Sequence, residues 1–144
     1  MKKTIGILAL GLISLAFVTK KESKAKDENG GIKFVNLSLE KAKSLAKEND
    51  QLIFIDAYTS WCGPCKKMAA TSFKDEEVGK LFNDQFINLK IDCEKDADGP
   101  ELARMYKVRA YPTLLVIDGD GKLVKQVVGF QPADKLISLA KSLD

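Results

Sequence analysis

Histidine is absent from the 144-residue sequence. Its absence excludes the sites that depend on imidazole: the Ser-His-Asp triad, the Cys-His protease pair, the H-E-x-x-H zinc site, Cys₂His₂ zinc fingers and histidine-ligated haem. Histidine is also the side chain that most readily exchanges protons near neutral pH. Acid–base chemistry in this protein must therefore rely on an Asp, Glu, Lys, Tyr or Cys whose pKa the fold has shifted.

An excess of charge of one sign is also lacking. The sequence holds 23 basic and 20 acidic residues, and residues 1–25 contain five of the lysines but a single acid, Glu22. The remainder has 18 basic and 19 acidic residues, a net charge of −1. Because nucleic-acid binders carry a basic stripe, we expect no nucleic-acid partner. The length suits one globular domain.

The apolar run at residues 5–18 is 14 residues long, whereas a membrane-spanning helix needs about 20. Lys2 and Lys3 precede this run, and Lys20 and Lys21 follow it closely, which is the layout of a secretory signal peptide. We therefore predict a signal peptide over residues 1–25, with an uncleaved membrane anchor and a buried core helix as alternatives. Export would place the protein in a periplasmic or other extracytoplasmic compartment, where disulfides persist.

Residues 26–31 are polar and end in two glycines, which predicts a flexible linker before a domain at residues 32–144. In that domain, segments of strand and helix character alternate. The near-continuous apolarity of Leu52–Tyr58 is typical of a strand buried on both faces. Strands are expected at residues 32–35, 52–58, 86–91, 113–117 and 123–128, and helices are expected to begin near Ser38, Cys62, Asp75, Pro100 and Pro132. This order predicts an α/β fold with a central mixed sheet, a terminal antiparallel hairpin and helices on both faces.

Cysteine is scarce, and two of the three cysteines lie in the segment Trp61-Cys62-Gly63-Pro64-Cys65. Positions i and i+3 lie on one face of a helix, about 5–6 Å apart at Cβ, so a small adjustment brings the two sulfurs to disulfide distance. A helix N-terminus stabilises an anion, which lowers the pKa of a thiol placed there. We therefore expect Cys62 to be the reactive cysteine and Cys65, one turn further on, to be more buried.

Two other interpretations of this pair are a structural disulfide and half of a zinc site. So small a ring stabilises the fold little, and a zinc site needs about two more ligands when only Cys93 remains. Thiol–disulfide exchange is therefore favoured, and we expect no metal.

Cys93 is expected to be buried and inert, with a reactive role as the alternative. The acidic segment 92–99 resembles a calcium loop only faintly, because Met105 stands where such a loop has a glutamate.

The sequence WCGPCK after a buried strand, with Tyr111-Pro112-Thr113 further on, resembles the thioredoxin family over roughly residues 32–144. The segments TSFKDEEV and YPTLLVIDGDGKLV are most similar to periplasmic thioredoxin-like domains, including the C-terminal domain of transmembrane thiol:disulfide interchange reductases. The resemblance implies a thioredoxin-like fold that reduces disulfides of client proteins through Cys62 and Cys65, without a dissociable cofactor. The alternatives are an oxidase or isomerase on the same fold and a non-redox peptide-binding or chaperone module.

The resemblance also implies that Asp56, six residues before Cys62, is a buried base that takes the proton from the second cysteine. Burial raises the pKa of a carboxyl, which makes it a usable base in a chain without histidine. The alternative is a structural acid held in an ion pair. Lys90, on the neighbouring strand, is a possible partner. The lysine of the family aligns with Asn88, on the same strand face as Lys90, which leaves open whether Lys90 takes its place.

A substrate-binding surface follows from the same resemblance. Pro112 matches the family's cis-proline, Tyr111 replaces the usual aliphatic residue before it, and Gly129 matches a glycine beside the substrate groove. An ordinary turn is the alternative for Gly129, and simple packing is the alternative for Trp61. The implied substrate-binding residues are Trp61, Gly63, Pro64, Tyr111, Pro112 and Gly129. The implied partners are disulfide-containing proteins and a membrane-bound electron-relay reductase, and we expect a monomer.

Overall fold

The computed structural model describes residues 30–144, so the predicted signal peptide and most of the predicted linker lie outside the described residues. The described chain alternates helices and strands in nearly the predicted order. The elements are α1 (Leu39–Asn49), β1 (Leu52–Tyr58), α2 (Gly63–Ala70), the 3-10 helix η1 (Ser72–Lys74), α3 (Glu76–Gln85), β2 (Phe86–Asp92), α4 (Gly99–Met105), β3 (Thr113–Ile117), β4 (Leu123–Val128) and α5 (Ala133–Lys141).

The strands form one mixed sheet in the order β2-β1-β3-β4. β1 and β2 run parallel, whereas β1 pairs with β3, and β3 with β4, in antiparallel fashion. The β3–β4 connection is closed by the Asp118 carboxylate, which accepts hydrogen bonds from the backbone N–H groups of Asp120 and Lys122. The predicted mixed sheet with a terminal hairpin is confirmed.

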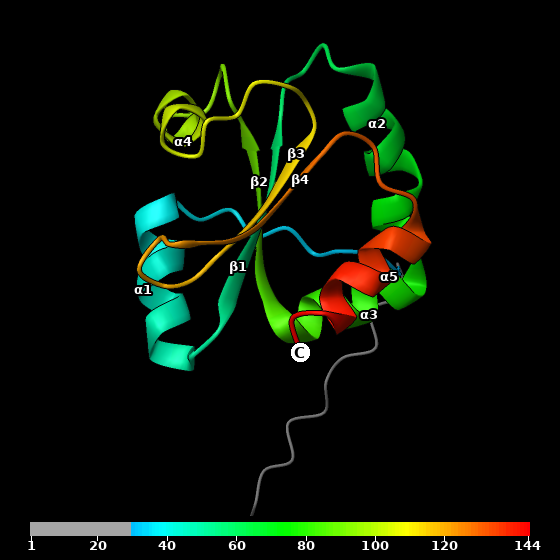
Figure 1. Ribbon diagram of the computed structural model, residues 1–144, viewed down its shortest axis with the longest axis horizontal. Helices are drawn as coiled ribbons and strands as arrows, with labels where there is room; N and C mark the ends of the chain where they lie inside the picture. Colours follow the sequence, from blue (N-terminus) through cyan, green and yellow to red (C-terminus); the bar gives the residue numbers. More distant parts are fainter. Residues whose placement is uncertain (1–29) are drawn as a thin grey trace, which may run out of the picture.

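Helices cover both faces of this sheet, as predicted (Figure 1). α1 and α4 pack on one face over a core that includes Ile55, Leu89 and Leu115. On the other face, α2, α3 and α5 enclose a core centred on Phe54. The Phe54 ring meets the edge of the Phe82 ring with centroids 4.8 Å apart, a favourable aromatic geometry. The apolar side chains on both strand faces explain why β1 reads as a continuous hydrophobic run.

The strand predicted at residues 32–35 is absent, and that prediction is wrong. Only one backbone hydrogen bond of this segment reaches β2, from Val35 N to Asn88 O at 2.9 Å. Ile32 N instead donates to Phe73 O, and Lys33 N donates to the Asn83 side chain. Because its donors are divided among three elements, the segment forms no ladder and lies as an extended strap across α3, η1 and the edge of β2.

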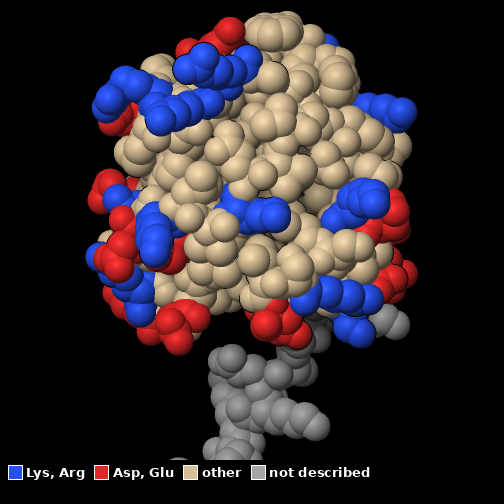
Figure 2. All heavy atoms as spheres, viewed as in Figure 1, with Lys and Arg blue, Asp and Glu red and all other residues tan. Residues whose placement is uncertain are grey.

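Among residues 30–144, none of the helices has the length and apolarity that crossing a membrane requires. Figure 2 shows basic and acidic side chains mostly toward the margin of one face, with basic side chains also near its middle and no stripe of a single sign across it. The face shown therefore matches the nearly balanced charge of the sequence after residue 25.

Candidate active site

The two cysteines lie at the start of α2, shortly after β1 ends. Cys62 is the N-cap of α2, and its sulfur accepts a hydrogen bond from Cys65 N at 3.1 Å. The two residues form a disulfide, and their Cα atoms are 5.3 Å apart. Pro64 occupies the first turn of α2, where its missing N–H costs no helical hydrogen bond. When the pair is reduced, the Cys62 sulfur therefore sits at a helix N-terminus that stabilises a thiolate.

The expectation that Cys65 is more buried than Cys62 is wrong. The exposed fraction is 3% for each of the two residues. The capping interaction explains this, because it turns the Cys62 sulfur inward against the first turn of α2.

Asp56 is completely buried in the middle of β1. Side chains alternate along a strand, so Asp56 faces the same layer as Phe54, which is the layer that contains α2. Its Oδ2 accepts from Lys90 Nζ at 2.7 Å, whereas its Oδ1 has no hydrogen-bond partner within residues 30–144. Burial raises the pKa of the Asp56 carboxyl, and this outweighs the lowering by the Lys90 ammonium.

The sequence left open whether Lys90 pairs with Asp56, and the register of β1 and β2 provides the answer. Lys90 lies directly opposite Asp56 in the parallel pair. Its ammonium is also 4.3 Å from the centroid of the Tyr58 ring and 5.6 Å from the centroids of the Phe34 and Phe73 rings. All three rings are close enough to the cation to stabilise its positive charge.

Asn88, at the position that aligns with the family's lysine, bonds to α3 residues instead of to Asp56. Its amide donates to Phe82 O at 3.2 Å and to the Asn83 side chain at 3.3 Å. It therefore joins β2 to the end of α3. The lysine beside the buried acid in this chain comes from a position two residues further along the strand.

The residues predicted to bind substrate gather around the cysteine pair. Trp61 is 63% exposed, and its ring meets the edge of the Tyr111 ring with centroids 6.0 Å apart. The Tyr111–Pro112 peptide bond is cis. Pro112 O accepts a hydrogen bond from Gly129 N at 2.8 Å, which joins two separate loops beside the disulfide.

Two glycines leave space on this surface. Gly129 has a φ of 89°, a conformation that favours glycine, and a Cβ added there would meet no atom within 4 Å. A Cβ at Gly63 would also meet open space, and both Gly63 and Pro64 are exposed. An extended chain can therefore approach the backbone closely at Gly129 and at the start of α2.

Cys93 lies behind this surface at the end of β2. Its side chain is buried, and burial raises the pKa of the Cys93 thiol to about 11. A thiol with so high a pKa carries little thiolate at neutral pH. The structure thus places Cys93 beside the site but gives it the environment of an unreactive cysteine.

The acidic segment after β2 distributes its carboxylates among different partners. Asp96 accepts from Asp92 N at 2.7 Å, Asp98 accepts from Leu39 N at 2.8 Å, and Glu94 accepts from Trp61 Nε1 at 3.0 Å. In the part of the chain that the structure describes, no group of three or more cysteine or acidic side chains is placed to hold a metal ion. The segment is therefore a loop with internal hydrogen bonds, and it contacts the active site where Glu94 bonds to Trp61.

Glu94 and Lys67 are residues of this region that sequence reasoning missed. Glu94 bonds to the indole of Trp61, and Lys67 Nζ lies 4.7 Å from the centroid of the Phe130 ring, next to Gly129. No spacing rule links these pairs, which are 33 and 63 positions apart in the sequence. Only the fold brings them together.

A sequence model described as "Thioredoxin" matches residues 33–142. Among curated relatives, the thioredoxin of Bacillus subtilis is 35% identical over 94 residues, which cover 65% of this chain and 84% of that protein. A protein disulfide-isomerase from Datisca glomerata is 29% identical over 133 residues, covering 90% of this chain and 26% of that protein. Alignments with this protein and two chloroplastic thioredoxins of Arabidopsis thaliana cover between 26% and 52% of those relatives' lengths.

Comparison with solved structures also finds similar folds. A protein from Bacteroides thetaiotaomicron assigned as a disulphide-isomerase is 42% identical, with a TM-score of 0.69 and coverage of 79% of this chain and 93% of that one. The oxidised DsbD C-terminal domain of Neisseria meningitidis is 26% identical, with a TM-score of 0.59 and coverage of 71% and 89%. The fold and the paired cysteines thus define a protein of the thioredoxin-like class. By the match over residues 33–142, the chain belongs to the thioredoxin family.

Proposed function

We propose that this protein is an extracytoplasmic thiol–disulfide oxidoreductase that reduces disulfides of client proteins through Cys62 and Cys65. The observation that carries the proposal is the position of the Cys62 sulfur at the N-terminus of α2, where it accepts the Cys65 N–H at 3.1 Å. The same N–H groups and helix dipole stabilise the Cys62 thiolate that attacks a disulfide.

The reaction proceeds in two exchanges. The Cys62 thiolate attacks one sulfur of the client disulfide, the client S–S bond breaks, and the other client sulfur leaves as a thiolate. The Cys65 thiolate then attacks Cys62 in the mixed disulfide and releases the second client sulfur. Two electrons pass from the Cys62–Cys65 dithiol to the client, the two client sulfurs take up protons, and the protein is left with the disulfide seen in the structure.

Asp56 supports the second exchange. Cys65 must lose its proton before it attacks, and a buried carboxylate with a raised pKa is a base of suitable strength. Oδ1 has no hydrogen-bond partner within residues 30–144, whereas Oδ2 is held by Lys90. One oxygen is thus free to accept a proton, directly or through a water molecule, while the other fixes the carboxylate in place.

The direction of electron flow has two candidates. The Gly63-Pro64 dipeptide between the cysteines resembles the reducing branch of the family, which supports a reductase. Isomerase or oxidase activity is the second candidate, and it is supported by the likeness to the Bacteroides thetaiotaomicron and Datisca glomerata disulfide-isomerases. An oxidase runs the same two exchanges in reverse, and the reduction potential of the pair decides which of these two directions is favoured.

The location and the electron source follow from separate observations. The charged, apolar and charged pattern of residues 1–25 supports export. A reductase in an oxidising compartment must receive electrons from a partner dithiol. The resemblance of the sequence to the C-terminal domain of transmembrane thiol:disulfide interchange reductases supports a membrane-bound relay in that role.

Insulin reduction tests the proposed activity and separates it from a non-redox chaperone. In excess dithiothreitol, wild-type protein is expected to accelerate precipitation of the insulin B chain, and Cys62→Ser is expected to abolish the acceleration. Cys93→Ser is the matched control, because it removes a cysteine outside the redox pair and should leave the acceleration intact. Precipitation no faster than with dithiothreitol alone, or equal acceleration by Cys62→Ser, would contradict the proposal.

A further inference from the structure

Seven residues near the cysteine pair are linked by contacts or as neighbours in the chain, and we call them the client face: Glu94, Trp61, Tyr111, Pro112, Gly129, Phe130 and Lys67. At one end, the Glu94 carboxylate accepts from Trp61 Nε1 at 3.0 Å, and the Trp61 ring meets the edge of the Tyr111 ring. This end of the client face therefore carries a negative charge held against an exposed aromatic ring.

The other end of the client face carries a positive charge. Pro112 O accepts from Gly129 N, and the next residue, Phe130, lies under Lys67 Nζ at 4.7 Å from the ring centroid. The loop is fixed against α2, since Gln131 N donates to the Met68 sulfur at 3.4 Å and Ser72 Oγ donates to Gln131 O at 2.7 Å. The ammonium of Lys67 is thus held over a rigid loop rather than on a free helix surface.

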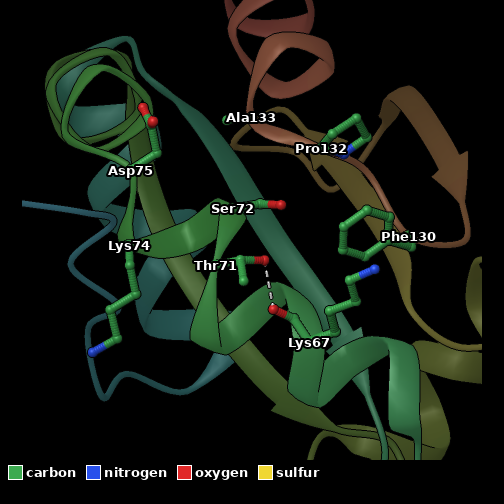
Figure 3. Close-up of a pocket in the computed structure, with 8 residues that line it drawn as sticks. All are labelled: Lys67, Thr71, Ser72, Lys74, Asp75, Phe130, Pro132 and Ala133. Carbon is green, nitrogen blue, oxygen red and sulfur yellow. Dashed lines mark hydrogen bonds between the residues drawn. The ribbon is translucent and has the colours of Figure 1, made fainter.

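A hollow of about 480 Å³ lies beside Lys67 and Phe130. In Figure 3 the Lys67 amine extends from α2 toward the Phe130 ring at the edge of this hollow, whereas Lys74 points away from Lys67. Asp75, the acid that lines the hollow, is the N-cap of α3, and its carboxylate accepts a hydrogen bond from Val78 N at 3.0 Å. The hollow therefore has room for a client side chain and a cation to meet it.

Both end charges face solvent without a counter-charge. Within residues 30–144, neither Glu94 nor Lys67 has an oppositely charged side chain in an ion pair. Charges left unpaired on either side of a binding surface orient a ligand of complementary charge more than they increase its affinity. Along the chain, the reactive Cys62–Cys65 disulfide lies between Trp61, which bonds to Glu94, and Lys67.

We propose that the client face selects client segments by charge polarity: an extended segment with a basic side chain on one side of its cysteine and an acidic side chain on the other. The basic side chain lies against Glu94 and Trp61, and the acidic one lies against Lys67 at the hollow. The inference rests on the proposed function, because the polarity acts on the first exchange with Cys62. A segment with the two charges exchanged meets like charges at both ends and reacts more slowly.

Two peptides of identical composition test this inference. The probes are Gly-Lys-Ala-Cys-Ala-Glu-Gly and Gly-Glu-Ala-Cys-Ala-Lys-Gly with blocked termini, each joined through its cysteine to 5-thio-2-nitrobenzoate. The Cys62 thiolate of the reduced protein attacks the peptide sulfur and releases the coloured thiolate, whose appearance gives the rate. Because two exposed ion pairs form in one orientation only, we expect the rates to differ roughly two- to tenfold at low ionic strength and to converge in 0.5 M salt.

Charge-swapped variants decide whether the client face causes the difference. Lys67→Glu combined with Glu94→Lys should reverse the order of the two peptides, and Lys67→Gln with Glu94→Gln should remove the difference. Lys80→Glu combined with Glu48→Lys is the matched control on distant exposed positions and should preserve the order. Equal rates in the wild type, or an order that the swap leaves unchanged, would overturn the inference. If Cys62→Ser releases the thiolate as fast as the wild type, the proposed function fails instead.

Discussion

Lys90 Nζ lies 2.7 Å from Asp56 Oδ2, and the two residues stand directly opposite each other on the parallel strands β2 and β1. The aspartate is completely buried, whereas the lysine side chain is 28% exposed and lies among three aromatic rings. The two partners are therefore in unequal environments. When the Asp56 carboxyl is protonated, the Lys90 cation still has its aromatic neighbours. When the carboxyl is ionised, its Oδ1 has no hydrogen-bond partner within residues 30–144. This asymmetry favours the protonated carboxyl.

The first prediction concerns the pH dependence of stability. The pKa of the Asp56 carboxyl is higher in the folded protein than in the unfolded chain because of burial, so the folded state binds more protons. The free energy of unfolding therefore falls as pH rises above about 3.9, until Asp56 is ionised in the folded protein. Asp56→Asn cannot ionise, so it should remove this decrease and raise the free energy of unfolding at pH 8 by about 1–3 kcal/mol.

Urea unfolding at pH 5 and pH 8, followed by the fluorescence of the single tryptophan, measures this effect. Asp134→Asn is the control, since this acid is exposed and outside the site.

The same Asp56→Asn variant should slow release of the mixed disulfide by up to about 10²-fold, because Cys65 loses its base. Lower stability at pH 8 with unchanged release would instead make Asp56 a structural acid.

The second prediction concerns Lys90. Lys90→Met keeps the length of the side chain but leaves the buried Asp56 carboxyl without its cation. We expect a loss of about 1–3 kcal/mol in the free energy of unfolding at pH 8, below the full cost of an unpaired buried charge because Asp56 can take up a proton. In the Asp56→Asn background the same change should cost less than about 1 kcal/mol. Equal costs in the two backgrounds, in a double-mutant cycle, would show that the two side chains are not energetically coupled.

The third prediction concerns Cys93. A thiol with a pKa of about 11 holds roughly 300-fold less thiolate at pH 7.5 than one with an ordinary pKa of about 8.5. In the reduced native protein, iodoacetamide should therefore label Cys93 at least about 100-fold more slowly than Cys62, and the Cys93 rate should rise about tenfold per pH unit below pH 11. Mass spectrometry of the labelled peptides gives both rates. Labelling of Cys93 as fast as Cys62 would make it a second reactive thiol.

The fourth prediction concerns the order of the two exchanges. Cys65→Ser keeps the attacking cysteine but removes the resolving one, so mixed disulfides with clients should accumulate on the protein. Cys62→Ser should accumulate none, because it removes the sulfur that caps the N-terminus of α2, and neither Cys65 nor the buried Cys93 holds that position. Non-reducing electrophoresis after acid quenching measures the trapped species. Comparable trapping by both variants would reverse or abolish the assigned roles.

The sequence predicted the features that depend on local pattern. The apolar run of β1, the Ser38 cap of α1 and the cysteine spacing at the start of α2 each act over a few residues, and the structure contains all three. The strand predicted at residues 32–35 failed because its apolar pattern does not reveal where its backbone donors go. Phe73 O and the Asn83 side chain take two of those donors, and both lie on elements far along the chain.

The candidate site was predictable as a set of residues but not as a set of contacts. Asp56 and Lys90 were both identified, yet their pairing depends on the register of β1 against β2, which no single strand specifies. The equal burial of Cys62 and Cys65 depends on the inward turn of the capping sulfur. Glu94 beside Trp61 and Lys67 over Phe130 depend on loop positions that the whole fold determines.

The reduction potential of the Cys62–Cys65 pair tests the central claim most directly. Equilibration of the purified protein with glutathione or dithiothreitol buffers, with Trp61 fluorescence as the readout, gives this value in one titration. A reductase should have a potential nearer to the roughly −270 mV of thioredoxin than to the roughly −120 mV of a strong oxidant. A value above roughly −160 mV would contradict the reductase and favour an oxidase that donates its disulfide.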